Sequence, residues 1–161
     1  MSPEIELDPS SFSGDTIEFM RLLGRHDVHY VVVGGEAVIF HGYPRFTGDV
    51  AFLYRRETDN AERLFQCLME FWQGSVPEVD SPEDLMVDGV ILQYGRPPNR
   101  IDLHNRIDGI SFDEAYDSRV IATLDANGER IEIPFIGIEP LKANKTASGR
   151  PKDLDDLEHL A

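Results

Sequence analysis

The run from His29 to Val33 constrains the fold of this chain more than any other segment. It is a nearly continuous apolar stretch rich in β-branched residues, and the pair Gly34-Gly35 ends it abruptly. Such a run is typical of a buried strand in a sheet that is covered on both faces. Helices on both faces of a sheet provide such cover, so the segment favours an α/β architecture.

The other patterns alternate between helical and extended segments. Strands are predicted at residues 49–54, 89–94, 100–104, 120–124 and 130–135, and helices at residues 11–24, 36–41, 60–72, 112–119, 138–148 and 152–160. The segment Asp125-Ala-Asn-Gly indicates a hairpin between the last two strands. Residues 1–10, which include two prolines, are predicted to be a flexible tail. Residues 11–161 are predicted to form one α/β (α+β) domain, with a mixed central sheet flanked by helices.

Composition places the chain among globular proteins. Its 161 residues are 41% hydrophobic and 28% charged, which suffices for one real core. No apolar run approaches the roughly 20 residues of a membrane span, and the acidic N-terminus does not resemble a signal peptide. The single cysteine, Cys67, is predicted to be buried in a helix. We therefore expect a cytoplasmic protein without membrane contact.

The net charge of −15 restricts the partners of the chain. Binding to a long nucleic-acid duplex depends on Lys and Arg at phosphates, and an acidic surface repels a polynucleotide. One basic cluster stands out near the C-terminus, formed by Lys142, Lys145, Arg150 and Lys152. A small anionic substrate escorted by Mg²⁺ fits this charge better than a long duplex does.

Two features carry candidate chemistry. Gly34 and Gly35 stand between a buried strand and a helix, where small residues let the backbone and its N–H groups approach a phosphate. Asp49 and Asp102 are predicted on two other strands, and alternation along each strand allows both carboxylates to face one side. Two such carboxylates, together with phosphate oxygens and water, suit Mg²⁺.

The segment from Gly34 to Val50 resembles the signature of the nucleotidyltransferase superfamily, which has the fold of DNA polymerase beta. The likeness is to its small bacterial AbiEii-like branch, where a glycine-rich turn and an Arg-x-Thr segment precede Asp-x-Asp on a strand. The segment from Lys142 to Leu157 resembles the closing motif of that branch. Together the two segments bracket residues 34–157.

The resemblance implies a nucleotidyltransferase fold and a definite activity. The family transfers a nucleoside monophosphate from a nucleoside triphosphate (NTP) to an acceptor, with two Mg²⁺ ions held by three carboxylates. By position, these carboxylates correspond to Asp49, residue 51 and Asp102. Gly34 and Gly35 would lie against the triphosphate. Lys145 would neutralise phosphate charge, with Arg45 and Lys142 as second choices.

Residue 51 departs from this pattern because it is alanine. The loss of one metal-binding carboxylate is expected to impair the transfer strongly, since phosphoryl transfer rests on positioning and charge stabilisation. Three interpretations stay open: an engineered inactivating change, a natural pseudoenzyme that binds nucleotide without turnover, or replacement of the carboxylate by Glu36 or Asp153.

Two hypotheses of function follow. The first is an Mg²⁺-dependent nucleotidyltransferase, impaired by Ala51, that acts on an NTP and an unknown acceptor. Members of the branch that the chain resembles often act in toxin–antitoxin or phage-defence pairs, and some modify tRNA ends. The second is a non-catalytic module that binds a partner protein. Structural interpretations also exist for single residues. Asp102, in an alternating strand with Arg100, suits one half of a cross-strand ion pair on a solvated face. Leu154, Leu157 and Leu160 suit the inner face of the last helix.

Overall fold

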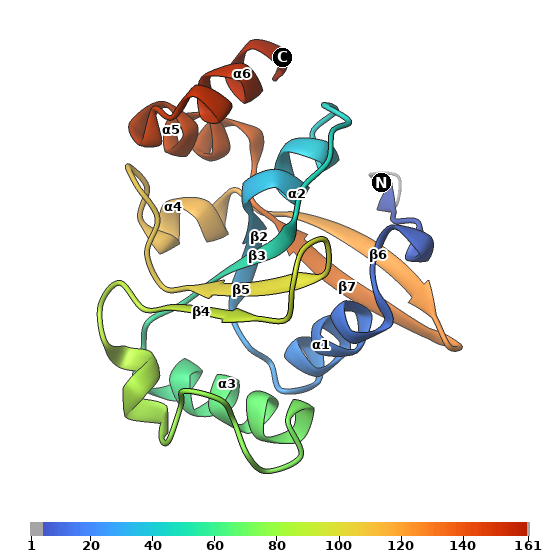
Figure 1. The fold of residues 1–161 in the computed structure, drawn as a ribbon, viewed down its shortest axis with the longest axis vertical. Helices are drawn as coiled ribbons and strands as arrows, with labels where there is room; N and C mark the ends of the chain where they lie inside the picture. The colour runs from blue at the N-terminus through green and yellow to red at the C-terminus, as the bar shows by residue number, and fades with distance from the viewer. Residues whose placement is uncertain (1–4, 161) are drawn as a thin grey trace.

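The computed structural model describes residues 5–160, which form a seven-stranded mixed sheet surrounded by helices (Figure 1). The strands are β1 (Ile5–Glu6), β2 (Tyr30–Val33), β3 (Asp49–Tyr54), β4 (Ile91–Tyr94), β5 (Arg100–His104), β6 (Val120–Ala126) and β7 (Glu129–Phe135). Their order in the sheet is β1-β6-β7-β2-β3-β5-β4. The predicted mixed α/β domain is thereby confirmed.

The helices divide between the two faces of the sheet. They are α1 (Gly14–Arg25), α2 (Gly34–Phe40), α3 (Thr58–Phe71), α4 (Phe112–Asp117), α5 (Ile138–Ser148) and α6 (Pro151–His159), with short 3₁₀ helices η1 (Pro9–Ser11) and η2 (Pro82–Met86). Helices α1 and α3 pack together, and α5 contacts α2, α4 and α6. In Figure 1, α5 and α6 lie at the end of the molecule opposite α3.

Strand β2 occupies the centre of the sheet, as its composition predicts. All four of its residues are buried, between β7 on one side and β3 on the other. Side chains alternate along β3, so neighbouring residues of this strand lie on opposite faces of the sheet. Phe52 points toward α1, where its ring meets Phe19 edge-on at 5.4 Å between centroids. Ala51 points the other way, toward Gly34 at the start of α2.

The N-terminal segment contains two short elements within residues 5–11. Ile5 and Glu6 pair in parallel with Ala122 and Thr123 of β6, and Pro9–Ser11 forms η1. This pairing covers the edge of β6, which would otherwise leave backbone groups unpaired. Residues 1–4 of the predicted tail lie outside the described residues. None of the helices described between residues 5 and 160 combines the length and the hydropathy that crossing a lipid bilayer requires.

Helix α6 buries a different face from the one predicted. Leu160 is buried, but Leu154 is 52% exposed, whereas Asp153 and Asp156 are fully buried. The leucine spacing therefore does not define the inner face of this helix. The inner face of α6 is defined instead by ion pairs with residues of α5 and of the α2–β3 loop.

Candidate functional site

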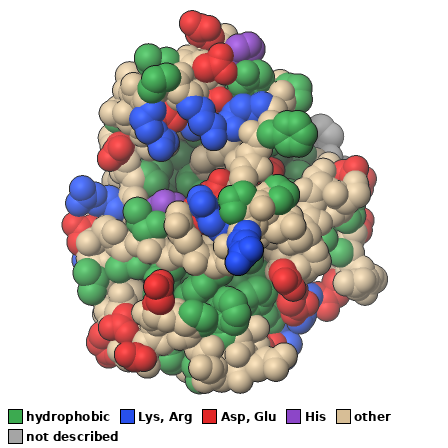
Figure 2. Space-filling model, in the orientation of Figure 1, with side chains coloured by type: hydrophobic (Ala, Val, Ile, Leu, Met, Phe, Trp, Pro, Cys, Tyr) green, Lys and Arg blue, Asp and Glu red, His purple; other side chains and the backbone are tan. Residues whose placement is uncertain are grey.

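The residues predicted from the glycine pair and the two aspartates converge on one cavity of about 540 Å³. It lies between the sheet face of β3 and β5 and the helices α5 and α6. Among its lining residues are Gly34, Gly35, Arg45, Asp49, Ala51, Asp102 and Lys145. Figure 2 shows Lys and Arg side chains gathered around a hollow on this side of the molecule.

The glycine pair packs closely against the segment that leads into β3. Gly34 has a φ of +66°, a conformation that favours glycine. A Cβ atom on Gly35 would lie 2.5 Å from Oγ1 and 2.8 Å from Cβ of Thr47. The missing side chains therefore bring the beginning of α2 against Thr47, in addition to any approach of a phosphate. Gly34 and Gly35 therefore allow close packing and also form part of the cavity wall.

The acidic residues lie side by side because β3 and β5 are parallel neighbours. Asp49 is opposite Arg100, and Ala51 is opposite Asp102. Since side chains alternate along a strand, these four residues share the face that lines the cavity. Arg100 donates from Nε and Nη2 to the two carboxylate oxygens of Asp102, at 2.7 and 2.9 Å. Its Nη2 lies 3.8 Å from Oδ2 of Asp49.

The two carboxylates have pKa values shifted in opposite directions. Burial raises the pKa of Asp49 to about 6, and the hydrogen bond and charge of neighbouring Asp102 add to the shift. Burial also acts on Asp102, but its hydrogen bonds with Arg100 and Asp49, together with the charge of Arg100, outweigh that effect, so the pKa of Asp102 is lowered. Glu36 is affected as well: burial, followed by the charge of Asp49, raises the pKa of Glu36 to about 7.

Asp49→Asn is expected to change how stability depends on pH. Between about pH 4 and pH 6, folded Asp49 retains a proton that the unfolded chain has released, so the free energy of unfolding falls as pH rises. The asparagine variant lacks this loss and should gain about 1–2 kcal/mol relative to the wild type between pH 4 and pH 7. Urea denaturation of both proteins across this range measures the difference. A difference in the free energy of unfolding that stays constant from pH 4 to pH 7 would contradict the raised pKa of Asp49.

The donor set does not fit a two-metal centre. Ala51 supplies no oxygen, and within the described residues no group of three or more His, Cys, Asp or Glu side chains is placed to hold a metal ion. Asp49 and Asp102 remain, and Arg100 already engages both oxygens of Asp102. Glu36 does not complete a three-residue group. Asp153, the other candidate replacement, points into a separate ion-pair cluster.

Lys145 lies at the centre of that cluster. Its Nζ is 3.1 Å from Oδ1 of Asp153 and 3.0 Å from Oδ2 of Asp156, and both aspartate side chains are fully buried. Arg45 binds Asp156 through two nitrogens, at 2.7 and 2.9 Å, and Arg150 binds Asp153 at 2.8 Å. These contacts outweigh burial and lower the pKa values of Asp153 and Asp156. The closing motif thus fixes α6 against α5 and the Arg45 loop.

Lys145 and Lys142, the two lysines predicted to bind phosphate, lie in different places relative to the cavity. Lys145 reaches the cavity wall, but only 5% of its side chain is exposed and its charge is engaged by two aspartates. Lys142 is not among the residues that line the cavity, and its Nζ lies 3.8 Å from Glu139 on the same helix. Although they are only three residues apart on α5, the two lysines therefore have different surroundings.

Sequence reasoning did not assign several residues of the cavity wall to the site, among them Thr47, Arg100, His104, Arg106 and Asn144. The alternation of β5 carries a signal for two of them, because residues 100, 102 and 104 share a strand face. Burial lowers the pKa of His104, which favours its neutral form. The site therefore combines acids, cations and a neutral imidazole.

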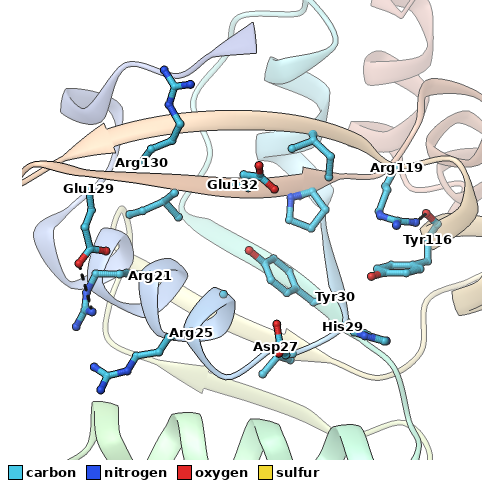
Figure 3. Close-up of a pocket in the computed structure, with 15 residues that line it drawn as sticks. Arg21, Arg25, Asp27, His29, Tyr30, Tyr116, Arg119, Glu129, Arg130 and Glu132 are labelled. Carbon is cyan, nitrogen blue, oxygen red and sulfur yellow. Dashed lines mark hydrogen bonds and ion pairs between the residues drawn. The ribbon is translucent and has the colours of Figure 1, made fainter. Parts of the chain in front are cut away.

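A larger cavity, of about 700 Å³, lies on another part of the surface, between α1 and the β6–β7 hairpin (Figure 3). Arginines and acids are mixed along its wall: Arg21 lies 3.9 Å from Glu129, and Arg119 stacks on the Tyr116 ring. No residue of the predicted site lines it. The smaller cavity is therefore the candidate functional site.

Comparisons with known proteins identify the family of the chain. A crystal structure of an antigenic nucleotidyltransferase-like protein from Paracoccidioides brasiliensis is similar to the chain, with 17% identity and a TM-score of 0.48, over 92% of this chain and 77% of that one. No curated protein matches. The model of a family described as "Nucleotidyltransferase of unknown function (DUF6036)" matches residues 15–161. The chain therefore belongs to this nucleotidyltransferase family.

Proposed function

We propose that the domain binds a nucleoside triphosphate in this cavity, and that transfer of the nucleoside monophosphate is weak or absent because residue 51 is alanine. The observation that carries the proposal is the concentration of positive charge. The chain has 15 Lys and Arg residues and a net charge of −15. Six of these cations line one cavity: Arg45, Arg100, Arg106, Lys145, Arg150 and Lys152.

A cavity of this kind attracts a small polyanion rather than a neutral ligand. Cations around a concave wall focus the potential and raise the local concentration of anions. The volume of about 540 Å³ falls within the range of small-molecule sites. Lys152 is exposed, and within the described part of the chain it has no ion pair, so its charge is available to a phosphate. The family membership favours a nucleotide as the source of that phosphate.

The weakness of the transfer follows from the acids. Phosphoryl transfer depends on cations that neutralise charge on the attacking and leaving oxygens, and carboxylates hold those cations. Ala51 removes one carboxylate, and Arg100 engages both oxygens of another, Asp102. Binding therefore has more support in this geometry than turnover does.

A second candidate is the Mg²⁺-dependent transfer itself, to a tRNA end or another acceptor, as the AbiEii-like resemblance implies. One observation favours it: Asp49, Asp102 and Glu36 are close enough for Asp102 to shift the pKa of Asp49, and for Asp49 to shift that of Glu36. The same resemblance suggests a protein partner from a toxin–antitoxin or defence pair. Release of pyrophosphate from an NTP by the wild-type protein with Mg²⁺ would establish turnover and favour this candidate.

Lys152→Gln tests the binding proposal directly. We expect this variant to bind its preferred NTP about fivefold more weakly than the wild type, because one exposed charge-assisted contact contributes about 1 kcal/mol. Calorimetric titration of ATP, GTP, CTP and UTP into both proteins measures this. Arg25→Gln is the control, since Arg25 pairs with Glu70 on the α1–α3 side of the sheet. Equal weakening in both variants would mean that net charge, and not the cavity, governs the affinity.

A further inference from the structure

The candidate site already holds a cation beside Asp49 and Asp102, and that cation is a side chain. We propose that Arg100 takes the place of the divalent cation in this site, so that the cavity binds its nucleotide without Mg²⁺. The inference rests on the proposed nucleotide binding and specifies its chemistry: the ligand is a metal-free NTP, held by guanidinium and ammonium groups.

The register of the sheet puts Arg100 where a shared cation would have to bind. Asp49 is its partner on β3, and Asp102 follows two residues later on its own strand. The guanidinium binds both oxygens of Asp102, at 2.7 and 2.9 Å, and lies 3.8 Å from the nearest oxygen of Asp49. A bidentate pair of this kind is among the strongest charge-assisted interactions in proteins. A metal ion would have to displace it before reaching Asp102.

Residue 51, the third carboxylate position of the family pattern, does not offset the engagement of Asp102 by Arg100. Residue 51 lies opposite Asp102 in the register, but it is alanine. The four positions 49, 51, 100 and 102 therefore carry two acids and one permanent cation, since arginine remains charged at every accessible pH. This arrangement lacks the negative charge that assembles two divalent cations.

Arg100 also retains the means to bind a phosphate. A guanidinium has five N–H donors, and the pair with Asp102 uses two of them. The side chain is 30% exposed at the cavity wall. Its remaining donors, together with Lys152 and Arg106 on the same wall, suit direct contact with phosphate oxygens.

Titration of the wild-type protein with the NTP that it prefers, in Mg²⁺ and again in EDTA, tests the proposal without any substitution. We expect dissociation constants that agree within about twofold. Binding that weakens at least tenfold in EDTA would overturn the inference and leave the proposed function standing. Absence of binding in both buffers would instead overturn the proposed function, and with it the metal-free nucleotide complex.

Titration of Mn²⁺ alone, followed by electron paramagnetic resonance, tests the role of Arg100 independently of any nucleotide. The wild type and Ala51→Asp are expected to bind Mn²⁺ weakly, because Arg100 still engages Asp102. The double variant Ala51→Asp, Arg100→Gln should bind it at least about tenfold more tightly than Ala51→Asp does. The control is the double variant Ala51→Asp, Arg96→Gln. Arg96 lies in the β4–β5 turn and does not line the cavity. Equal Mn²⁺ affinity of Ala51→Asp and both double variants would contradict the proposal.

Discussion

Lys145→Met is expected to lower the free energy of unfolding by about 3–5 kcal/mol. The reason is that Lys145 is the shared partner of two fully buried carboxylates, with Nζ 3.1 Å from Asp153 and 3.0 Å from Asp156. Removing one member of a buried ion-pair network leaves charge that water cannot reach. Arg45 and Arg150 would remain as partners but could not replace the central ammonium. Equilibrium urea denaturation at pH 7 measures the loss.

Lys142→Met provides the matched control on the same helix. Lys142 is partly exposed and lies 3.8 Å from an exposed Glu139, so its removal should cost less than about 0.5 kcal/mol. If the two variants lose equal stability, the buried cluster does not fix α6, and Lys145 is available for a phosphate after all. The comparison thus separates a structural lysine from a ligand-binding one.

Gly35→Ala is the second change with a large expected effect. The added Cβ would lie 2.5 Å from Oγ1 and 2.8 Å from Cβ of Thr47, so that the α2 segment or the loop before β3 must shift. Such overpacking costs about 1–3 kcal/mol. Because the shift moves a wall of the cavity, nucleotide affinity should fall with stability. Thermal unfolding and calorimetric titration of the same variant give the two quantities.

Gly24→Ala shows what the same substitution does where space is open. A Cβ on Gly24 meets no atom within 4 Å, and the residue lies inside α1. The change should therefore stabilise the protein by about 0.5–1 kcal/mol, through helix propensity alone. A Gly35→Ala variant that unfolds at the temperature of the wild type, with unchanged affinity, would refute the close packing of Gly35 against Thr47.

The sequence was most informative where a local pattern and the tertiary fold impose the same demand. The apolar run ending at Val33 must be buried, and β2 lies in the centre of the sheet. Strands at residues 49–54 and 100–104 agree with β3 and β5. Their alternation was enough to expect Asp49 and Asp102 on one face, and both line the same cavity.

The sequence was least informative where long-range charge pairs decide the outcome. In α6 the leucine spacing predicts Leu154 on the inner face, but the buried residues are Asp153 and Asp156. Their partners come from α5 and from Arg45, more than 100 residues away for Asp156. No pattern of hydrophobic residues contains that information. For the same reason, spacing along α5 could not tell that Lys145 would be engaged and Lys142 would lie outside the cavity wall.

The short strand at the N-terminus was not predicted, for a related reason. Ile5–Glu6 is too short to register as a strand by itself, and it forms β1 because β6 offers an open edge. The hydrogen bond of Leu7 N–H to the carbonyl of Thr123 continues the same pairing. An edge pairing of two residues depends on the partner strand, which lies more than 100 residues further along the chain.

The proposed nucleotide site is the cavity between β3, β5, α5 and α6. Titrating the preferred NTP into ¹⁵N-labelled protein, and following the amide signals, tests it most directly. We expect saturable shifts at Gly34, Gly35, Ala51 and Asp102 and none around Arg21 and Glu129, which line the cavity beside α1. Saturable shifts confined to that second cavity, or no shifts with any of the four nucleotides, would contradict the account.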